Sequence, residues 1–255
     1  LPGRIHTYRL GPLVASELDY KMDAKQVLAT GALPGIWIEP DLHEKQKTLQ
    51  SYAATYLKEE IQAEALSRNI EGFSRFLFVA AAEAGKFLDL SKLSQEARIP
   101  RQTGVRFFEI LEDTLIVRRC DAFRKSERKR LIQAPRFFFF DTGVLNGLLG
   151  NFVASTDRIG MLFEHLVFNQ VYDSAAARDI PLRISSYRTE HGAEVDFIFE
   201  IGGKVIAVEV KASFNVGSSD LGGLKNFADY LGKKHRAIIA YLGQVSKKIG
   251  TIDIL

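Results

Sequence analysis

Residues 193–211 read AEVDFIFEIGGKVIAVEVK, and this segment is the most informative about the structure of the C-terminal half of the chain. Its centre is Gly202-Gly203, a dipeptide suited to a two-residue turn with positive φ. The residues on both sides of the turn are rich in β-branched and aromatic side chains, as strands are. We therefore expect strands at residues 194–200 and 204–211, joined as an antiparallel hairpin.

The turn also sets the register of this hairpin, because a two-residue loop fixes which residues face each other. On one face every predicted pair is apolar, so this face is expected to pack on the core. The pairs are Val195 with Val210, Phe197 with Val208, and Phe199 with Ile206.

The other face of the hairpin pairs Asp196 with Glu209 and Glu194 with Lys211. Like charges directly opposite each other on a sheet lose stability, on the scale of about 0.2–1 kcal/mol for a cross-strand pair. A raised pKa, exposure to solvent or a bound cation could offset this loss. Two neighbouring carboxylates also form the hard oxygen site that Mg²⁺ prefers. The pair therefore predicts a site for Mg²⁺ or Mn²⁺.

Two further side chains could complete this site. Lys211 shares a strand face with Glu209, so its ammonium could stabilise developing negative charge or help position an attacking water. Glu164 lies on a predicted helix at residues 159–175 and could add a third carboxylate. The alternatives are a salt bridge from Lys211 to Glu194, and an ordinary boundary position for Glu164 on an amphipathic helix.

The elements around the hairpin predict an α/β domain at residues 151–255. A strand is expected at residues 182–188, before the hairpin. A helix after Asp220 and a strand at residues 237–242 follow the hairpin. With the helix at residues 159–175, the order is helix, three strands, helix and strand, which favours a mixed sheet with helices packed on it.

The preceding part of the chain, residues 71–150, has the pattern of a winged helix-turn-helix. Helices are predicted at residues 71–84, 91–97 and 101–113, and two strands follow at residues 115–119 and 136–140. Three helices and a hairpin are typical of that DNA-binding module. The start of its third helix presents Arg101, Gln102 and Arg106 outward.

The hairpin of this module is strongly basic, which favours contact with a phosphate backbone. The alternatives are a solvated loop, a hairpin that docks onto another part of the same chain, and a protein-docking unit. The basic residues are Arg118, Arg119, Arg124, Lys125, Arg128, Lys129, Arg130 and Arg136, and of these we assign Arg124, Lys125, Arg128, Lys129 and Arg130 to DNA.

The overall composition is that of an ordinary globular protein. Of the 255 residues, 46% are hydrophobic and 25% are charged, which excludes a disordered or collagen-like chain. The net charge of +3 is too small to indicate a partner by itself. The single cysteine, Cys120, cannot form an internal disulfide, and we expect a cytoplasmic protein without a membrane span.

The segments around Asp196 and around Glu209 and Lys211, preceded by Phe163-Glu164, resemble the PD-(D/E)xK nuclease superfamily, which has a restriction-endonuclease-like αβββαβ fold. More closely, nearly the whole chain resembles the C-terminal part of bacterial and archaeal AAA-type ATPases that end in such a nuclease-like domain of unknown function. The residues that carry the resemblance are Phe163-Glu164, residues 193–196 and 208–211, Tyr8–Leu13, Gly31–Pro34, Tyr52–Ile61, Phe139–Gly143 and Tyr187-Arg188.

The resemblance implies that Asp196 and Glu209 are metal ligands, that Lys211 is the catalytic lysine and that Glu164 is the acidic residue of the helix. Residues 1–70 would then be a helical segment that follows a missing ATPase core. The chain has no phosphate-cradling GxxxxGK[ST] loop, so it is not expected to bind or hydrolyse ATP alone. The start at Leu1-Pro2-Gly3 is interpreted as the edge of a piece of a longer protein.

These observations lead to three hypotheses. The first is Mg²⁺-dependent hydrolysis of DNA, with the winged helix holding the substrate. The second is a catalytically idle nuclease fold that binds DNA or a partner protein and regulates an attached ATPase. The third is a winged-helix binding module with no enzymatic role. Metal binding separates the first two.

Overall fold

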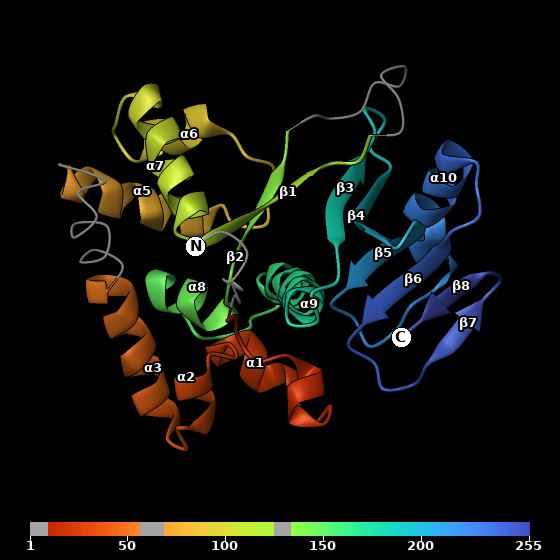
Figure 1. The fold of residues 1–255 in the computed structure, drawn as a ribbon, viewed down its shortest axis with the longest axis horizontal. Helices are drawn as coiled ribbons and strands as arrows, with labels where there is room; N and C mark the ends of the chain where they lie inside the picture. The colour runs from red at the N-terminus through yellow and green to blue at the C-terminus, as the bar shows by residue number, and fades with distance from the viewer. Residues whose placement is uncertain (1–9, 57–68, 125–133) are drawn as a thin grey trace, which may run out of the picture.

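The computed structural model describes residues 10–56, 69–124 and 134–255. Within these residues, helices form the N-terminal part, and a mixed sheet of eight strands extends into the C-terminal part (Figure 1). The strand order in the sheet is β2-β1-β3-β4-β5-β6-β8-β7.

The N-terminal part is a set of short helices packed beside α8 (Thr142–Leu149). Two of these helices have an aspartate as N-cap, whose carboxylate accepts a hydrogen bond from a backbone N–H group of the first turn. Asp23 accepts from Lys25 and Asp41 accepts from Glu44. The elements are a 3-10 turn (Ala15–Leu18), α1 (Ala24–Thr30), α2 (Pro34–Ile38), α3 (Leu42–Ser51) and a π-helical turn (Tyr52–Tyr56).

The middle part contains three helices and a hairpin, close to the predicted positions. Between the first and second helix, residues 85–88 run beside β2. The amide of Gly85 donates to the carbonyl of Phe137 at 2.8 Å, and that of Leu88 donates to Pro135 at 2.7 Å. The elements are α5 (Ile70–Ala82), α6 (Leu90–Glu96), α7 (Arg101–Asp113), β1 (Val117–Ala122) and β2 (Arg136–Phe139).

The hairpin of this middle part belongs to the large sheet. Strand β1 pairs antiparallel with β2 and also pairs parallel with β3 (Leu182–Arg188), where Asp121 faces Ser185. The described strands of this hairpin therefore dock onto another part of the same chain, which is one of the alternatives given above. Residues 125–133, which hold most of the predicted basic cluster, lie outside the described residues.

The C-terminal part has the predicted order of helix, three strands, helix and strand. Two short strands, β7 and β8, were not predicted, and β8 extends the sheet by pairing parallel with β6. The elements are α9 (Ile159–Ala176), β3, β4 (Glu194–Ile201), β5 (Lys204–Lys211), a 3-10 turn (Ser218–Leu221), α10 (Gly222–Leu231), β6 (Arg236–Tyr241), β7 (Lys247–Ile249) and β8 (Ile252–Ile254).

The predicted register of the β4–β5 hairpin is confirmed from the Phe197–Val208 pair to the turn, where Gly202 and Gly203 both have positive φ. The prediction for Val195 is wrong. The pairing of β4 with β3 shifts by one residue between Ile198 and Val195. This bulge turns Val195 into the cluster on the α10 side, whereas Phe197 packs on the α9 side.

Two hydrophobic clusters cover the two faces of the sheet. The larger includes Leu28, Phe73, Phe138 and Val208, and it continues across the expected boundary at residues 150–151. Its centre is a stack of Phe138 on Phe168 of α9, with ring centroids 4.5 Å apart. The three phenylalanines of β2, Phe137–Phe139, are buried. This shared core holds the middle part and the C-terminal part together.

Among the described residues, no helix is both long enough and apolar enough to cross a membrane.

Candidate active site

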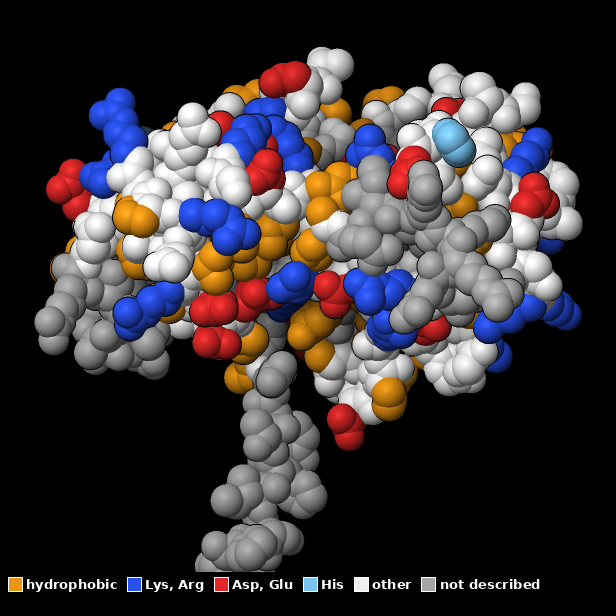
Figure 2. Space-filling model, turned by 90° about the horizontal axis from the view of Figure 1, so that it is seen from above, with side chains coloured by type: hydrophobic (Ala, Val, Ile, Leu, Met, Phe, Trp, Pro, Cys, Tyr) orange, Lys and Arg blue, Asp and Glu red, His pale blue; other side chains and the backbone are white. Residues whose placement is uncertain are grey.

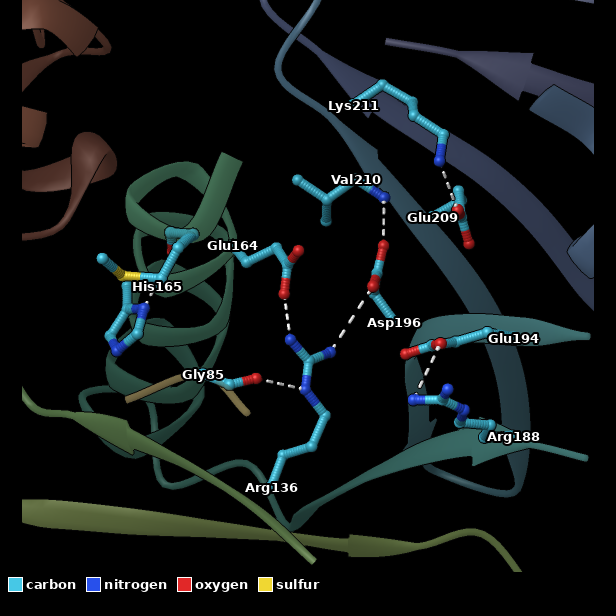
Figure 3. Close-up of polar contacts among 11 residues, drawn as sticks. Gly85, Arg136, Glu164, His165, Arg188, Glu194, Asp196, Glu209, Val210 and Lys211 are labelled. Atoms are coloured by element: carbon cyan, nitrogen blue, oxygen red, sulfur yellow. Dashed lines mark hydrogen bonds and ion pairs between the residues drawn. The ribbon is translucent and has the colours of Figure 1, made fainter. Parts of the chain in front are cut away.

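The four side chains predicted to form the site come together beside α9 (Figure 3). Glu164 lies on α9, Asp196 near the start of β4, and Glu209 and Lys211 at the end of β5. Because β4 and β5 are antiparallel, the start of one strand lies beside the end of the other. The hairpin thus brings Asp196 beside Glu209 and Lys211, and the packing of α9 against β5 adds Glu164.

Arg136 of β2 lies among these carboxylates and was not predicted to be there. Its guanidinium donates to a carboxylate oxygen of Glu164, and it contacts Asp196 Oδ1 at 3.4 Å. Its Nε donates to the carbonyl oxygen of Gly85 at 2.7 Å. The side chain is only 6% exposed, so this is a buried charge held by two carboxylates. An arginine directly before a buried phenylalanine run is the signal that could have indicated it.

The carboxylate of Asp196 is fixed on both of its oxygens. While Oδ1 contacts Arg136, Oδ2 accepts a hydrogen bond from the backbone amide of Val210 at 2.8 Å. The regular pairing of β4 with β5 reaches Phe197–Val208, and the Asp196 side chain bridges the two strands beyond that point. Asp196 is therefore held against β5 next to Glu209.

Lys211 donates to Glu209 Oε1 at 2.7 Å. The predicted alternative, a salt bridge from Lys211 to Glu194, is wrong, because the bulge in β4 changes the position of Glu194, which pairs with Arg188 at 3.6 Å. The second oxygen of Glu209, Oε2, is buried and has no hydrogen-bond partner among the described residues. A buried carboxylate oxygen without a partner is costly unless a proton or a cation satisfies it.

Burial and neighbouring charges shift the pKa values of the side chains in the site. Burial raises the pKa of Glu164 and of Glu209 to about 7, and the charge of Asp196 contributes to both shifts in the same direction. Burial opposes the charge on Lys211 and on Arg136, but the neighbouring carboxylates outweigh it and raise the pKa of both. Lys211 is therefore an ammonium ion at neutral pH, able to stabilise negative charge but not to act as a base.

The number of carboxylates in the site decides which metal ion it could hold. No group of three or more His, Cys, Asp or Glu side chains with the geometry of a metal site occurs in the described part of the chain. Mg²⁺ needs fewer protein ligands, because it is commonly held by one or two carboxylates together with water and substrate phosphate. Asp196 and Glu209, with the unpaired Oε2 of Glu209, fit that pattern.

The residues predicted to bind DNA have different surroundings. Arg101, Gln102 and Arg106 are exposed on α7, and Arg124 is exposed after β1. Lys125, Arg128, Lys129 and Arg130 lie outside the described residues. Figure 2 shows Lys and Arg side chains on both sides of an apolar strip, mixed with Asp and Glu. Among the described residues on this face, basic and acidic side chains are thus mixed.

Two arginines of the predicted basic cluster point into the protein interior and form ion pairs there. Arg118 forms an ion pair with Asp173 of α9 at 2.7 Å, with both side chains nearly buried, and Arg136 lies in the carboxylate site. The prediction that these two arginines add to a phosphate-binding surface is corrected, because both are largely buried in ion pairs with carboxylates.

Comparison with known proteins gives no described activity. The chain is 23% identical over 215 residues to the uncharacterized protein Rv2008c of Mycobacterium tuberculosis and, equally, to the uncharacterized protein Mb2031c of Mycobacterium bovis. The alignment covers 83% of this chain and 48% of each relative, so the chain spans about half the length of the curated relatives it matches. No solved structure matches significantly.

Two families match in succession along the chain. Residues 159–255, which include all four predicted site residues, match Domain of unknown function (DUF4143). Residues 21–155, which include Arg136, match Domain of unknown function (DUF8612). Because this second match covers more than half of the chain, the protein belongs to the DUF8612 family.

Proposed function

We propose that this chain is a Mg²⁺-dependent nuclease of the PD-(D/E)xK type that hydrolyses phosphodiester bonds of DNA. The observation that carries the proposal is the Asp196–Glu209–Lys211 group, in which one buried oxygen of Glu209 has no partner among the described residues. The elements around this group follow the order helix, three strands, helix and strand, which supports the same fold family.

Each side chain has a distinct role in this proposal. Asp196 and Glu209 would hold Mg²⁺, which would polarise the phosphoryl oxygen and lower the pKa of a bound water. The Lys211 ammonium, fixed by Glu209, offers positive charge to the phosphate as negative charge develops on it. Arg136 holds Asp196 and Glu164 in place from the opposite side.

The middle part of the chain supports DNA as the substrate. Its order of helix, extended segment, two helices and hairpin supports a winged helix-turn-helix in this proposal. Arg101, Gln102 and Arg106 are exposed at the start of α7, the third helix of that order. In this proposal they contact DNA and hold it near the carboxylates, with Arg124 and the basic residues of 125–133 adding phosphate contacts.

A second candidate function is an idle nuclease fold that binds DNA or a partner protein and regulates an attached AAA-type ATPase. The observation that favours it is Arg136, whose guanidinium already neutralises Glu164 and Asp196. The attached ATPase core rests on the family resemblance alone. In this candidate the chain still binds DNA or a partner, but it does not cleave.

The test is cleavage of labelled DNA with Mg²⁺ or Mn²⁺ and with EDTA. We expect metal-dependent cleavage by the wild type and none by the Asp196→Asn/Glu209→Gln variant. The amide oxygen introduced at position 196 can still accept from Val210, so this variant should keep the fold. Glu200→Gln is the matched control, because Glu200 also lies on β4 but contacts only Arg183, at 3.7 Å, among the ion pairs of the described residues. DNA binding without cleavage would favour the idle fold.

A further inference from the structure

A groove runs between the middle part and the sheet, next to the carboxylate site. It consists of two hollows, of about 430 Å³ and about 600 Å³, which share Phe87 and Asp89. The residues that line the first hollow include Glu83, Phe87, Asp89, Arg136, Arg188 and Glu194. Because Arg136 is part of its wall, the first hollow adjoins the carboxylates. The second extends to Arg101 and Arg119.

Phe87 lies where the two hollows meet, and its backbone is firmly held. The segment around it pairs with β2 through the amides of Gly85 and Leu88, and Phe87 itself bridges to Arg136. The guanidinium of Arg188 lies over the Phe87 ring, 4.9 Å from its centroid. The half-buried ring and the guanidinium form a stacking platform that faces the groove.

The charges along the groove suit an anionic chain. Arg101 and Arg119 line one end, and Arg188 lines the other. The acidic lining residues are engaged. Glu83 pairs with Lys86 and Lys92, and Asp89 accepts hydrogen bonds at the start of α6. Glu194 contacts Arg188 at 3.6 Å, a looser pair than those of Glu83. The Nε of Arg188 is buried without a hydrogen-bond partner among the described residues.

We propose that this groove binds single-stranded nucleic acid, with one base stacked at Phe87 and the backbone phosphates beside Arg101 and Arg188. A paired base cannot expose its face to an aromatic ring, whereas an unpaired base can, and a cationic groove with such a ring is how proteins bind single strands. This proposal rests on the proposed function for its biological meaning. It adds to that function because it places an unpaired nucleotide next to the carboxylates.

The test is binding in EDTA, which separates the groove from metal-dependent cleavage. Fluorescein-labelled oligodeoxythymidine, oligouridine and a duplex of equal length would be titrated with the whole chain, and anisotropy recorded. We expect a single strand to bind more tightly than the duplex. Preference for oligodeoxythymidine or for oligouridine identifies DNA or RNA as the source of the strand.

Variants of Phe87 test the stacking platform. Phe87→Leu keeps apolar volume but removes the ring, so single-strand affinity should fall about 5- to 150-fold, the range of one base–aromatic stack. Phe87→Tyr should keep most of the affinity. Phe214→Leu is the control, because Phe214 is 69% exposed and lines neither hollow. Circular dichroism checks that each variant folds.

Two results would overturn this inference: equal affinity for single strand and duplex, or unchanged single-strand affinity in Phe87→Leu. Loss of metal-dependent cleavage alone contradicts only the proposed nuclease, because binding is measured without divalent cations. Tight, Phe87-dependent binding of a single strand by a chain that does not cleave would support the groove and contradict the nuclease.

Discussion

Replacing Arg136 with methionine is expected to lower the free energy of unfolding by about 3–5 kcal/mol at about pH 8, the cost of removing one partner from a buried ion pair. Methionine fills much of the space of the arginine stem but leaves Glu164 and Asp196 without their cation. The carbonyl of Gly85 also loses its donor. Urea denaturation followed by circular dichroism measures the effect.

The pH dependence of this loss has a definite sign. Because burial raises the pKa of Glu164 above its ordinary value, its proton binds more tightly in the folded state, and this contribution to stability is lost as the pH rises through about 7. Without Arg136, protonation of Glu164 relieves the unpaired charge. The deficit of Arg136→Met should therefore be smaller at about pH 5.5 than at about pH 8.

Two variants serve as comparisons for Arg136→Met. Adding Glu164→Gln to it should recover part of the lost stability, because one unpaired carboxylate is removed. Arg119→Met breaks ion pairs that are 45% exposed on the arginine side and should cost less than about 1 kcal/mol. If Arg136→Met costs no more than Arg119→Met, Arg136 does not hold the site together.

Replacing Lys211 with methionine is expected to lower the rate of metal-dependent DNA cleavage about 10²- to 10³-fold, the usual cost of removing one group that stabilises charge in the transition state. Lys211 carries a full charge at neutral pH, because Glu209 and Asp196 raise its pKa despite burial. Metal affinity should not fall, since the substitution removes a positive charge beside the carboxylates. Single-turnover cleavage at saturating Mg²⁺, with calorimetry, measures both quantities.

Lys204 provides the matched control for this prediction. It lies at the exposed start of the same strand, so Lys204→Met should cleave at the wild-type rate. Lys211→Arg keeps the charge and should recover part of the rate. Cleavage by Lys211→Met at the wild-type rate would show that the ammonium takes no part in the reaction.

Elements with strong local patterns were predictable from the sequence. The helix at residues 101–113 and the strands at residues 182–188 and 204–211 have the predicted bounds. Gly202-Gly203 fixed the hairpin register, because only a short turn with positive φ joins the two strands. That register alone was enough to predict that Asp196 lies close to Glu209.

The features that the sequence did not reveal all depend on contacts between distant residues. The bulge in β4 arises where β3 pairs with it, and it moved Val195 and Glu194 from their predicted partners. The parallel pairing of β1 with β3 joins residues far apart in the chain. Arg136 lies on β2, which joins the sheet through β1, so its place before the buried phenylalanines indicates a buried charge but not its carboxylate partners.

Calorimetric titration of Mg²⁺ and Mn²⁺ into the whole chain measures whether Asp196 and Glu209 bind a divalent cation. The matched sample is the Asp196→Ala/Glu209→Ala variant, with its folding checked by circular dichroism. We predict binding to the wild type and none to the variant. Absence of binding to the wild type, even with DNA present, would contradict the nuclease and leave a recognition module in which the carboxylates hold Arg136 in place of a metal ion.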